Sequence, residues 1–306
     1  MQPKYIDSWP ELDFNRYQGT LETLHQWIQI VGKVRLKTMP WQNHSWHSTL
    51  YVSATGFSTH GIPHDGRIFE IDLDFKQHKL LIQCSNAEPL TMELKPRTVA
   101  SFYEELLDKL ASIGVSPRLH ARPNEIDPAI PFAENTEHTT YDPEMAHNLW
   151  KAMLKVNGVF NQFRTEFVGK ASPVHLFWGA FDLAVTRFSG HPAPEHPGGM
   201  PNMPLEVMQE AYSQEVSSAG FWPGSKDSPM PVFYAYAYPV GEGFGTQKVL
   251  PSAAFYSQEM GEFFLKYDDV RNAENPEQTL HDFLQTTYEA AVNTANWDRK
   301  KLEKSN

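Results

Sequence analysis

The sequence contains a single cysteine, Cys84, so no disulfide can form within the chain. One cysteine also excludes a cysteine-ligated iron–sulfur cluster and a structural zinc site built from several cysteines. The N-terminal residues MQPKYIDSWPELDF lack the apolar stretch of a secretory signal. Together these absences predict a cytoplasmic protein. Cys84 lies in LIQCSN, where we expect a structural strand residue rather than a nucleophile.

Long apolar runs and excess basic charge are also missing. No run of about 18 apolar residues occurs, which excludes a membrane-spanning helix. The 26 Lys and Arg residues are outnumbered by 37 Asp and Glu residues, so the net charge is -11. This charge repels nucleic-acid phosphates and anionic membrane surfaces. We therefore expect a small-molecule ligand as partner, with no nucleic acid and no membrane; the oligomeric state is unknown at this stage.

Three common enzyme motifs are absent. The sequence has no GxGxxG, no P-loop and no GxSxG, so nucleotide-binding loops and the esterase nucleophile elbow lack support. What the 306 residues do contain is 23 prolines, 13% aromatic residues and 13 histidines. Two interpretations follow: a rigid, loop-rich domain with an aromatic core, or a pocket that carries histidines.

The first half of the chain, residues 1–121, predicts a helix, a group of strands and a second helix. Residues 67–76 (RIFEIDLDFK) alternate apolar and acidic side chains, which is typical of an antiparallel strand with one wet face. The helix is expected to start at the N-cap Thr20 and to end near Gly32, where glycine favours a stop. The other elements that we expect are strands at 48–58, 79–83 and 90–94 and a helix at 99–113.

Residues 122–142 are polar and rich in proline, which indicates a connecting loop between the halves. The second half, 143–306, begins with a helix capped by Asp142 and Pro143, and we expect it to carry the main site. Further expected elements are strands at 174–188 and 231–239, an irregular loop at 189–204, a short helix at 205–214 and a final helix after Asn275.

The predicted fold is therefore α+β, with antiparallel sheets, helices on their outer faces and two similar halves. An internal echo supports similar halves: NHSWHSTLYVSATGFSTHGIP aligns without a gap with SPVHLFWGAFDLAVTRFSGHPAP. His44 then matches His175, and a Val-Gly-Lys triplet precedes each segment. A duplication predicts a pocket shared between the halves. A β-α-β-β-β unit like those of vicinal-oxygen-chelate enzymes is an alternative for the second half.

The 174–188 strand offers the first candidate site. Its even positions carry small residues and one carboxylate, Asp182, a pattern typical of a cavity wall, although an ordinary surface face is the alternative. Trp178 shares this face. His175 and Asp182 are candidate catalytic residues, and Glu215 is a candidate general base or ligand.

Histidines in two short motifs could bind a metal. HSWH places His44 and His47 three residues apart, and the stiff loop HPAPEHPGG presents His196. Together with His175 they form a possible ligand set for a divalent metal such as zinc or iron. The spacing matches no known zinc signature, so these histidines are equally read as loop anchors that bond backbone carbonyls.

Aromatic and basic residues complete the candidate site. Tyr234, Tyr236 and Tyr238 share one face of the 231–239 strand; with Trp178 and Trp222 they would form an aromatic pocket wall, or a plain surface ladder. Three basic residues could bind an anionic ligand: Arg187, Lys33 and Lys170. The two lysines could instead bond helix C-terminal carbonyls.

The chain resembles a bacterial family of unknown function. The resemblance rests on the segments SWPELDF, TLHQWIQIVGK, NHSWH, VGKASPVHLFWGAFDLAVTRFSG, HPGG, EVSSAGFWPG, YAYAYP and FLQTTYEAA. It extends from Ser8 to Arg299 and implies a shared fold but no reaction. The family pattern has Arg where this chain has His191 and His where it has Gln214, which weakens His191 as a metal ligand.

Three functions remain open from the sequence. The first is an enzyme that acts on a small polar or anionic metabolite in a pocket of histidines and aromatic residues, with or without a metal. The second is a non-catalytic binding or sensor protein. The third is a scaffold protein that interacts through an exposed apolar patch.

Overall fold

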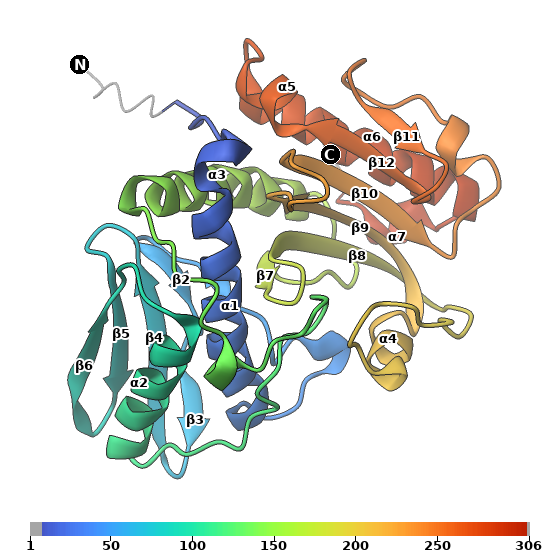
Figure 1. Cartoon of the computed structure of the whole chain (residues 1–306). Coiled ribbons are helices and arrows are strands. Elements are labelled where there is room, and N and C mark those ends of the chain that lie inside the picture. Colours follow the sequence, from blue (N-terminus) through green and yellow to red (C-terminus); the bar gives the residue numbers. More distant parts are fainter. Residues whose placement is uncertain (1–7, 305–306) are drawn as a thin grey trace, which may run out of the picture.

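The computed structural model describes residues 8–304 (Figure 1). Within them the chain forms two antiparallel sheets with helices packed against them, which confirms the α+β prediction. None of the helices in this range is long and apolar enough to cross a membrane. The helices are α1 (Phe14–Thr38), α2 (Val99–Ser112), α3 (Pro143–Arg164), α4 (Leu205–Ala211), α5 (Tyr267–Arg271), α6 (Pro276–Ala295) and α7 (Arg299–Leu302).

The first sheet has the strand order β1-β2-β4-β5-β6, and β3 pairs with β4 as well. Its strands are β1 (Tyr51–Val52), β2 (Gly56–Ser58), β3 (Ile62–His64), β4 (Arg67–Asp74), β5 (Lys79–Cys84) and β6 (Ala87–Glu93). The alternation predicted for β4 is confirmed, because Phe69 and Ile71 are fully buried and Glu70 is half-buried. The Trp27 ring of α1 stacks on Phe102 of α2 at 4.6 Å and so joins the two helices over this core.

The second sheet has the order β11-β12-β10-β9-β8-β7. Its strands are β7 (His175–Phe177), β8 (Asp182–Pro192), β9 (Gln214–Trp222), β10 (Val232–Tyr238), β11 (Phe255–Ser257) and β12 (Glu262–Lys266). Helices α3 and α6 lie along one face (Figure 1), where Leu183 and Val185 are fully buried. We call the other face the open face; it is formed by Asp182, Ala184 and Thr186 of β8, Ser218 and Gly220 of β9, Tyr234, Tyr236 and Tyr238 of β10 and Glu262 of β12.

The two sheets meet at one point. Leu50 and Leu176 exchange two backbone hydrogen bonds of 3.0 and 2.8 Å, so the edge of one sheet continues into the edge of the other. Helix α1 lies between the two sheets (Figure 1), and one apolar core extends through both halves. Residues near this junction therefore lie close to both halves. The domain boundary expected at residues 122–142 stays a prediction.

Helix α1 is longer than predicted at both ends. It begins at Phe14 because Asp13 caps it, accepting a hydrogen bond from the Asn15 backbone N–H at 3.1 Å. The helix continues through Gly32. This glycine does not end the helix but leaves room for the Trp178 ring to pack against it. A side chain at this position would lie 2.1 Å from the Trp178 ring.

The strand predicted at 174–188 is two strands. β7 and β8 form a hairpin whose turn occupies 178–181, with Phe181 in the left-handed conformation (φ 62°). Trp178 therefore lies in the turn instead of on the strand face. Its indole N–H donates to the Ser48 carbonyl at 2.7 Å, and the ring is buried at the junction of the halves.

Both halves run from a helix through antiparallel strands to another helix. The gapless internal alignment, however, pairs His44, in the 3-10 turn η1 (Asn43–Ser45), with His175 in β7. It also places β1 and β2 against the single strand β8. Residues that are identical in the alignment thus lie in different kinds of secondary structure. The internal duplication stays a prediction.

Candidate active site on the second sheet

Asp182 and Tyr234 form the centre of the candidate site. The Tyr234 hydroxyl donates a hydrogen bond to Asp182 Oδ2. Gly220 lies opposite Tyr234 in the β9–β10 pairing, and a side chain there would come within 2.2 Å of the Tyr234 ring. The glycine thus lets the phenol lie across β9 and reach Asp182. Burial raises the pKa of Asp182 to about 6, and the bond from Tyr234 opposes this rise.

Glu125, in the connecting loop, lies close enough to Asp182 for the two charges to interact. Its carboxyl group occupies the space beside Gly179, where a side chain would lie 1.9 Å from Glu125 Oε1. Its backbone is left-handed (φ 58°), and its N–H donates to the Pro201 carbonyl at 3.1 Å. Burial, followed by the negative charge of Asp182, raises the pKa of Glu125 to about 7.

Glu262 completes the acidic cluster from β12. Burial and then the charge of Asp182 raise its pKa to about 7 as well. Three carboxyl groups from separate segments therefore interact through their charges, because Asp182 influences both Glu125 and Glu262. Carboxyl groups with pKa values near neutrality can both accept and donate protons at physiological pH.

Side chains of helix α1 bond the backbone of the two segments beside this cluster, at Asn124 and at Gly179. Gln29 bonds the backbone of Asn124 in both directions, donating to its carbonyl and accepting from its N–H, each at 2.8 Å. The same Gln29 amide donates to the Gly179 carbonyl at 3.2 Å. His25 Nε2 lies 2.7 Å from that carbonyl. Burial lowers the pKa of His25 to about 4, so the ring is neutral and donates from Nε2.

A row of aromatic side chains continues from Tyr234 along the open face. The hydroxyls of Tyr236 and Tyr212 lie 2.9 Å apart, and the His196 ring stacks on Tyr212 at 4.5 Å. Tyr238 lies 5.1 Å from the same imidazole, and its hydroxyl donates to the Pro194 carbonyl. The three strand tyrosines share a face as the alternation predicts, and the Pro-rich loop packs on their end. Trp222 is half-buried on this face of β9.

The four candidate metal histidines are not brought together. Within residues 8–304, no three His, Cys, Asp or Glu side chains lie close enough to hold a metal ion. His47 Nδ1 bonds the backbone of Gln42, and His196 Nδ1 accepts from the Gly198 N–H at 3.0 Å. These two are the loop anchors of the alternative interpretation. His44 bonds the Ala211 carbonyl and contacts Lys170.

His175 is buried with only 1% of its surface exposed, and neither ring nitrogen has a hydrogen-bond partner among residues 8–304. Burial, and then the charge of Arg164, lowers its pKa to about 3, so the ring stays neutral. It lies opposite Ala184 in the strand pairing, and its ring packs against Phe177 with 4.6 Å between the ring centres. Its ring contact is thus with an aromatic residue of its own strand.

Arg187 belongs to the core instead of the open face. It is 1% exposed and donates to the Phe163 carbonyl, with the Phe163 and Tyr288 rings 3.4 and 4.3 Å from its guanidinium carbon. Glu215 lies toward the same side of the sheet, since Ser217, two residues along β9, pairs with Arg187. Its carboxylate is 3.7 Å from His191. Neither residue reaches Asp182 in this arrangement.

Lys33 lies behind the site. It is 3% exposed, donates to Asn124 Oδ1 and lies 5.2 Å from the centre of the Trp178 ring. Burial lowers its pKa to about 8. It thus supports the Asn124–Glu125 segment and does not line the open face as a ligand-binding cation.

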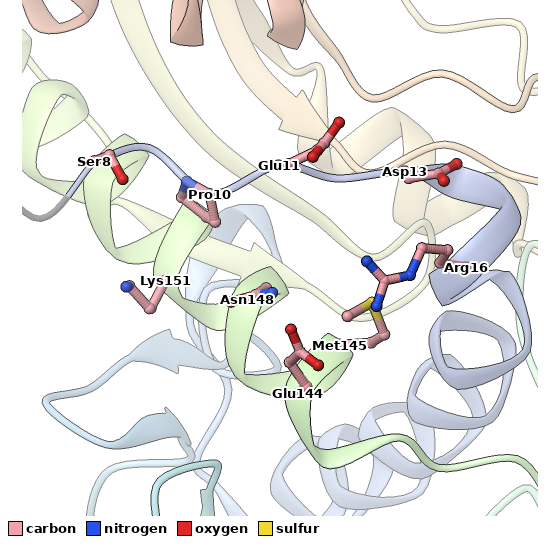
Figure 2. A pocket seen from close by; sticks show the side chains of 9 residues that line it. All are labelled: Ser8, Pro10, Glu11, Asp13, Arg16, Glu144, Met145, Asn148 and Lys151. Carbon is pink, nitrogen blue, oxygen red and sulfur yellow. The ribbon is translucent and has the colours of Figure 1, made fainter.

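A separate cleft of about 290 Å³ opens where residues 8–13 cross over α3 (Figure 2). It is lined by Ser8, Pro10, Glu11, Asp13, Arg16, Glu144, Met145, Asn148 and Lys151. Five of the nine side chains are charged, with both signs present, and four of these five are exposed. Solvated charges of this kind are typical of an ordinary protein surface. Asp182, by contrast, is buried and bonded to a tyrosine, so we place the candidate site there.

A family model described as a family of unknown function, DUF5996, matches residues 9–304. The chain belongs to DUF5996. This confirms the resemblance drawn from the sequence segments. No curated protein and no solved structure matches the chain. DUF5996 membership assigns no reaction, so the site rests on its geometry.

Sequence reasoning missed three members of the site. Glu125 lies in a polar, Pro-rich loop, Tyr212 follows α4, and Glu262 begins β12. Only Glu262 had a usable signal, because it alternates with the buried Phe263 and Leu265 of a strand. Nothing in the loop sequence indicates that Glu125 turns toward Asp182.

Proposed function

We propose that the open face around Asp182 is the active site of an enzyme that transfers a proton to or from a small polar metabolite. The observation that supports this most is a buried carboxylate, Asp182, that accepts a hydrogen bond from the Tyr234 hydroxyl on the open face. Burial raises its pKa to about 6 and, together with the charge of Asp182, raises the pKa of Glu125 and of Glu262 to about 7. Carboxyl groups with shifted pKa values that come together from separate segments are typical of catalytic sites.

The three groups would divide the roles by their pKa values. At neutral pH Asp182 is mostly ionised, with the Tyr234 hydroxyl bonded to it, and would act as the base. Glu125 and Glu262 are each near half protonation and would supply the acid. Tyrosine rings along the open face would hold the substrate and limit the access of water.

The charge of the site favours a neutral or positively charged polar substrate over an anionic one. The cluster contributes carboxylates, while Arg187, the strongest candidate for an anion-binding cation, is buried on the opposite face. The proposal needs no metal, because proton transfer by the carboxyl groups is sufficient. We further propose a cytoplasmic location and no nucleic-acid partner, from the single cysteine and the net charge of -11.

Proton transfer can be tested without knowing the substrate. The protein is incubated with pooled small polar metabolites in deuterated water, and mass spectrometry follows both deuterium uptake and new products. We expect the wild type to act on at least one compound and Asp182→Asn to be slower by about 100-fold or more. Glu88→Gln, which changes an exposed carboxylate of β6, is the matched control. Equal rates for Asp182→Asn and wild type would refute the proposal.

A non-catalytic binding protein is the second candidate. It is favoured by the bond from Tyr234, which gives Asp182 a partner without any ligand. In this case a metabolite would raise the melting temperature of the wild type, and Asp182→Asn would reduce that shift, with no exchange or product formed. The same metabolite pool therefore separates the two candidates.

A further inference from the structure

Lys170 occupies a niche of its own between η1 and β9, which the proposed function does not use. Its Nζ lies 2.5 Å from His44 Nε2 and donates to Gln214 Oε1 at 2.9 Å. The Phe188 ring centre lies 4.6 Å and the Trp46 ring centre 5.8 Å from Nζ. The side chain is only partly buried, so a small molecule can reach the amine.

The imidazole beside Lys170 is oriented as a base. His44 Nδ1 lies 3.1 Å from the Ala211 carbonyl, which only accepts hydrogen bonds, so Nδ1 carries the proton of the neutral ring. The lone pair of Nε2 then points at Lys170. The Glu210 carboxylate accepts from the His44 backbone N–H at 2.8 Å and holds the left-handed backbone of His44 (φ 55°) in place.

We propose that Lys170 is a nucleophilic amine that forms an imine with a small aldehyde or ketone, with His44 as its proton acceptor. The amine lone pair attacks the carbonyl carbon, the carbonyl electron pair moves to oxygen, and one amine proton passes to His44 Nε2. His44 then returns a proton to the carbinolamine oxygen. As the nitrogen lone pair forms the carbon–nitrogen double bond, the carbon–oxygen bond breaks. The second amine proton passes through His44 to the departing hydroxide, which leaves as water.

The charged groups around Lys170 agree with this role. Within residues 8–304, Nζ makes no ion pair with a carboxylate. Burial lowers the pKa of Lys170, and the charge of Glu210 opposes this shift. Burial and then the charge of Lys170 lower the pKa of His44, whereas the charge of Glu210 raises it. Both directions favour an uncharged amine beside a neutral imidazole.

Lys33 is an internal comparison for this proposal. It follows the other Val-Gly sequence and also lies over a tryptophan, Trp178, with a neutral acceptor, Asn124. Lys33 is, however, 3% exposed, and in the described part of the chain its hydrogen bond goes to the Asn124 amide oxygen instead of an imidazole. It should therefore react far more slowly than Lys170 with any dissolved carbonyl compound.

The test uses propanal as the carbonyl probe and cyanoborohydride to reduce any imine to a stable amine. Peptide mass spectrometry then gives the alkylation rate of each lysine. At about pH 7, where an ordinary lysine is almost fully protonated, we expect Lys170 to react about tenfold faster than the exposed Lys226. A rate for Lys170 at or below that of Lys226 would overturn the proposal.

His44→Asn tests the proton acceptor, because asparagine tolerates the left-handed backbone but is no base. The Lys170 rate should fall to that of Lys226, and an unchanged rate in a folded variant would overturn the role of His44. If the variant does not fold, the alkylation rates of Lys170 and Lys226 in the wild type are measured as a function of pH. The pH at which the rate is half its maximum should be lower for Lys170 than for Lys226, and equal values would overturn the proposal.

Discussion

Replacing Asp182 by asparagine should stabilise the protein at neutral and alkaline pH. In the folded protein the pKa of Asp182 is raised from 3.8 to about 6. Ionisation is therefore harder in the folded state than in the unfolded state, and the wild type loses stability as the pH rises between these two values. The asparagine side chain of the Asp182→Asn variant has no such ionisation, and its amide oxygen can still accept the hydrogen bond from Tyr234.

The size of the effect follows from the shift. A pKa raised by about two units corresponds to about 3 kcal/mol of stability lost by the wild type once Asp182 is fully ionised. Removing this charge should also lower the pKa values of Glu125 and Glu262, since Asp182 contributes to both. The gain in the variant should thus be absent below about pH 4, grow between about pH 4 and pH 6, and be complete above that range.

Urea unfolding at a series of pH values measures the difference directly. The free energies of unfolding of wild type and Asp182→Asn should coincide in acid and separate with rising pH, at unchanged denaturant dependence. Glu88→Gln should follow the wild type throughout. If Asp182→Asn were less stable than the wild type by a constant amount at every pH, Asp182 would be an ordinary structural acceptor and the reasoning would be refuted.

Three further substitutions test the surroundings of the site. Gly220→Ala should cost about 1–3 kcal/mol in urea unfolding, because the new methyl group meets the Tyr234 ring; a neutral substitution would show that the ring is not packed on β9. Arg187→Ala should lower the free energy of unfolding by about 3 kcal/mol or more, because a buried residue loses its contacts with Phe163 and Tyr288; unchanged stability would contradict its place in the core. Gln29→Ala should speed hydrogen exchange at the Asn124 amide, by about tenfold, since that N–H loses its acceptor; an unchanged rate would mean that Gln29 does not hold the loop.

Strand periodicity accounts for the part of the site that the sequence revealed. Asp182 and the tyrosines of β10 lie in strands where side chains alternate between faces, so their common face follows from spacing alone. By the same alternation Arg187 falls on the face of Leu183 and Val185, where the structure buries it. Its neighbours come from α3 and α6, whose packing on the sheet no local pattern specifies.

The rest of the site depends on contacts between distant segments. Glu125 lies within the electrostatic influence of Asp182, and Gln29 and Pro201 hold its loop there. A loop has no periodicity that predicts such bonds. The metal hypothesis for the histidines stays a prediction, and the positions of these side chains depend on local contacts. His47 and His196 bond backbone groups close to them in sequence, and such local bonds keep side chains apart that spacing alone could not locate.

The most direct test of the central claim is the titration of the carboxyl groups themselves. Carbon-13 NMR of labelled Asp and Glu side chains follows each carboxyl group with pH, and Asp182→Asn and Glu125→Gln assign the signals. The account predicts that Asp182, Glu125 and Glu262 titrate near neutrality, and that Asp182→Asn lowers the pKa values of the two glutamates. Titration of all three in the ordinary acidic range of about 4 would contradict it.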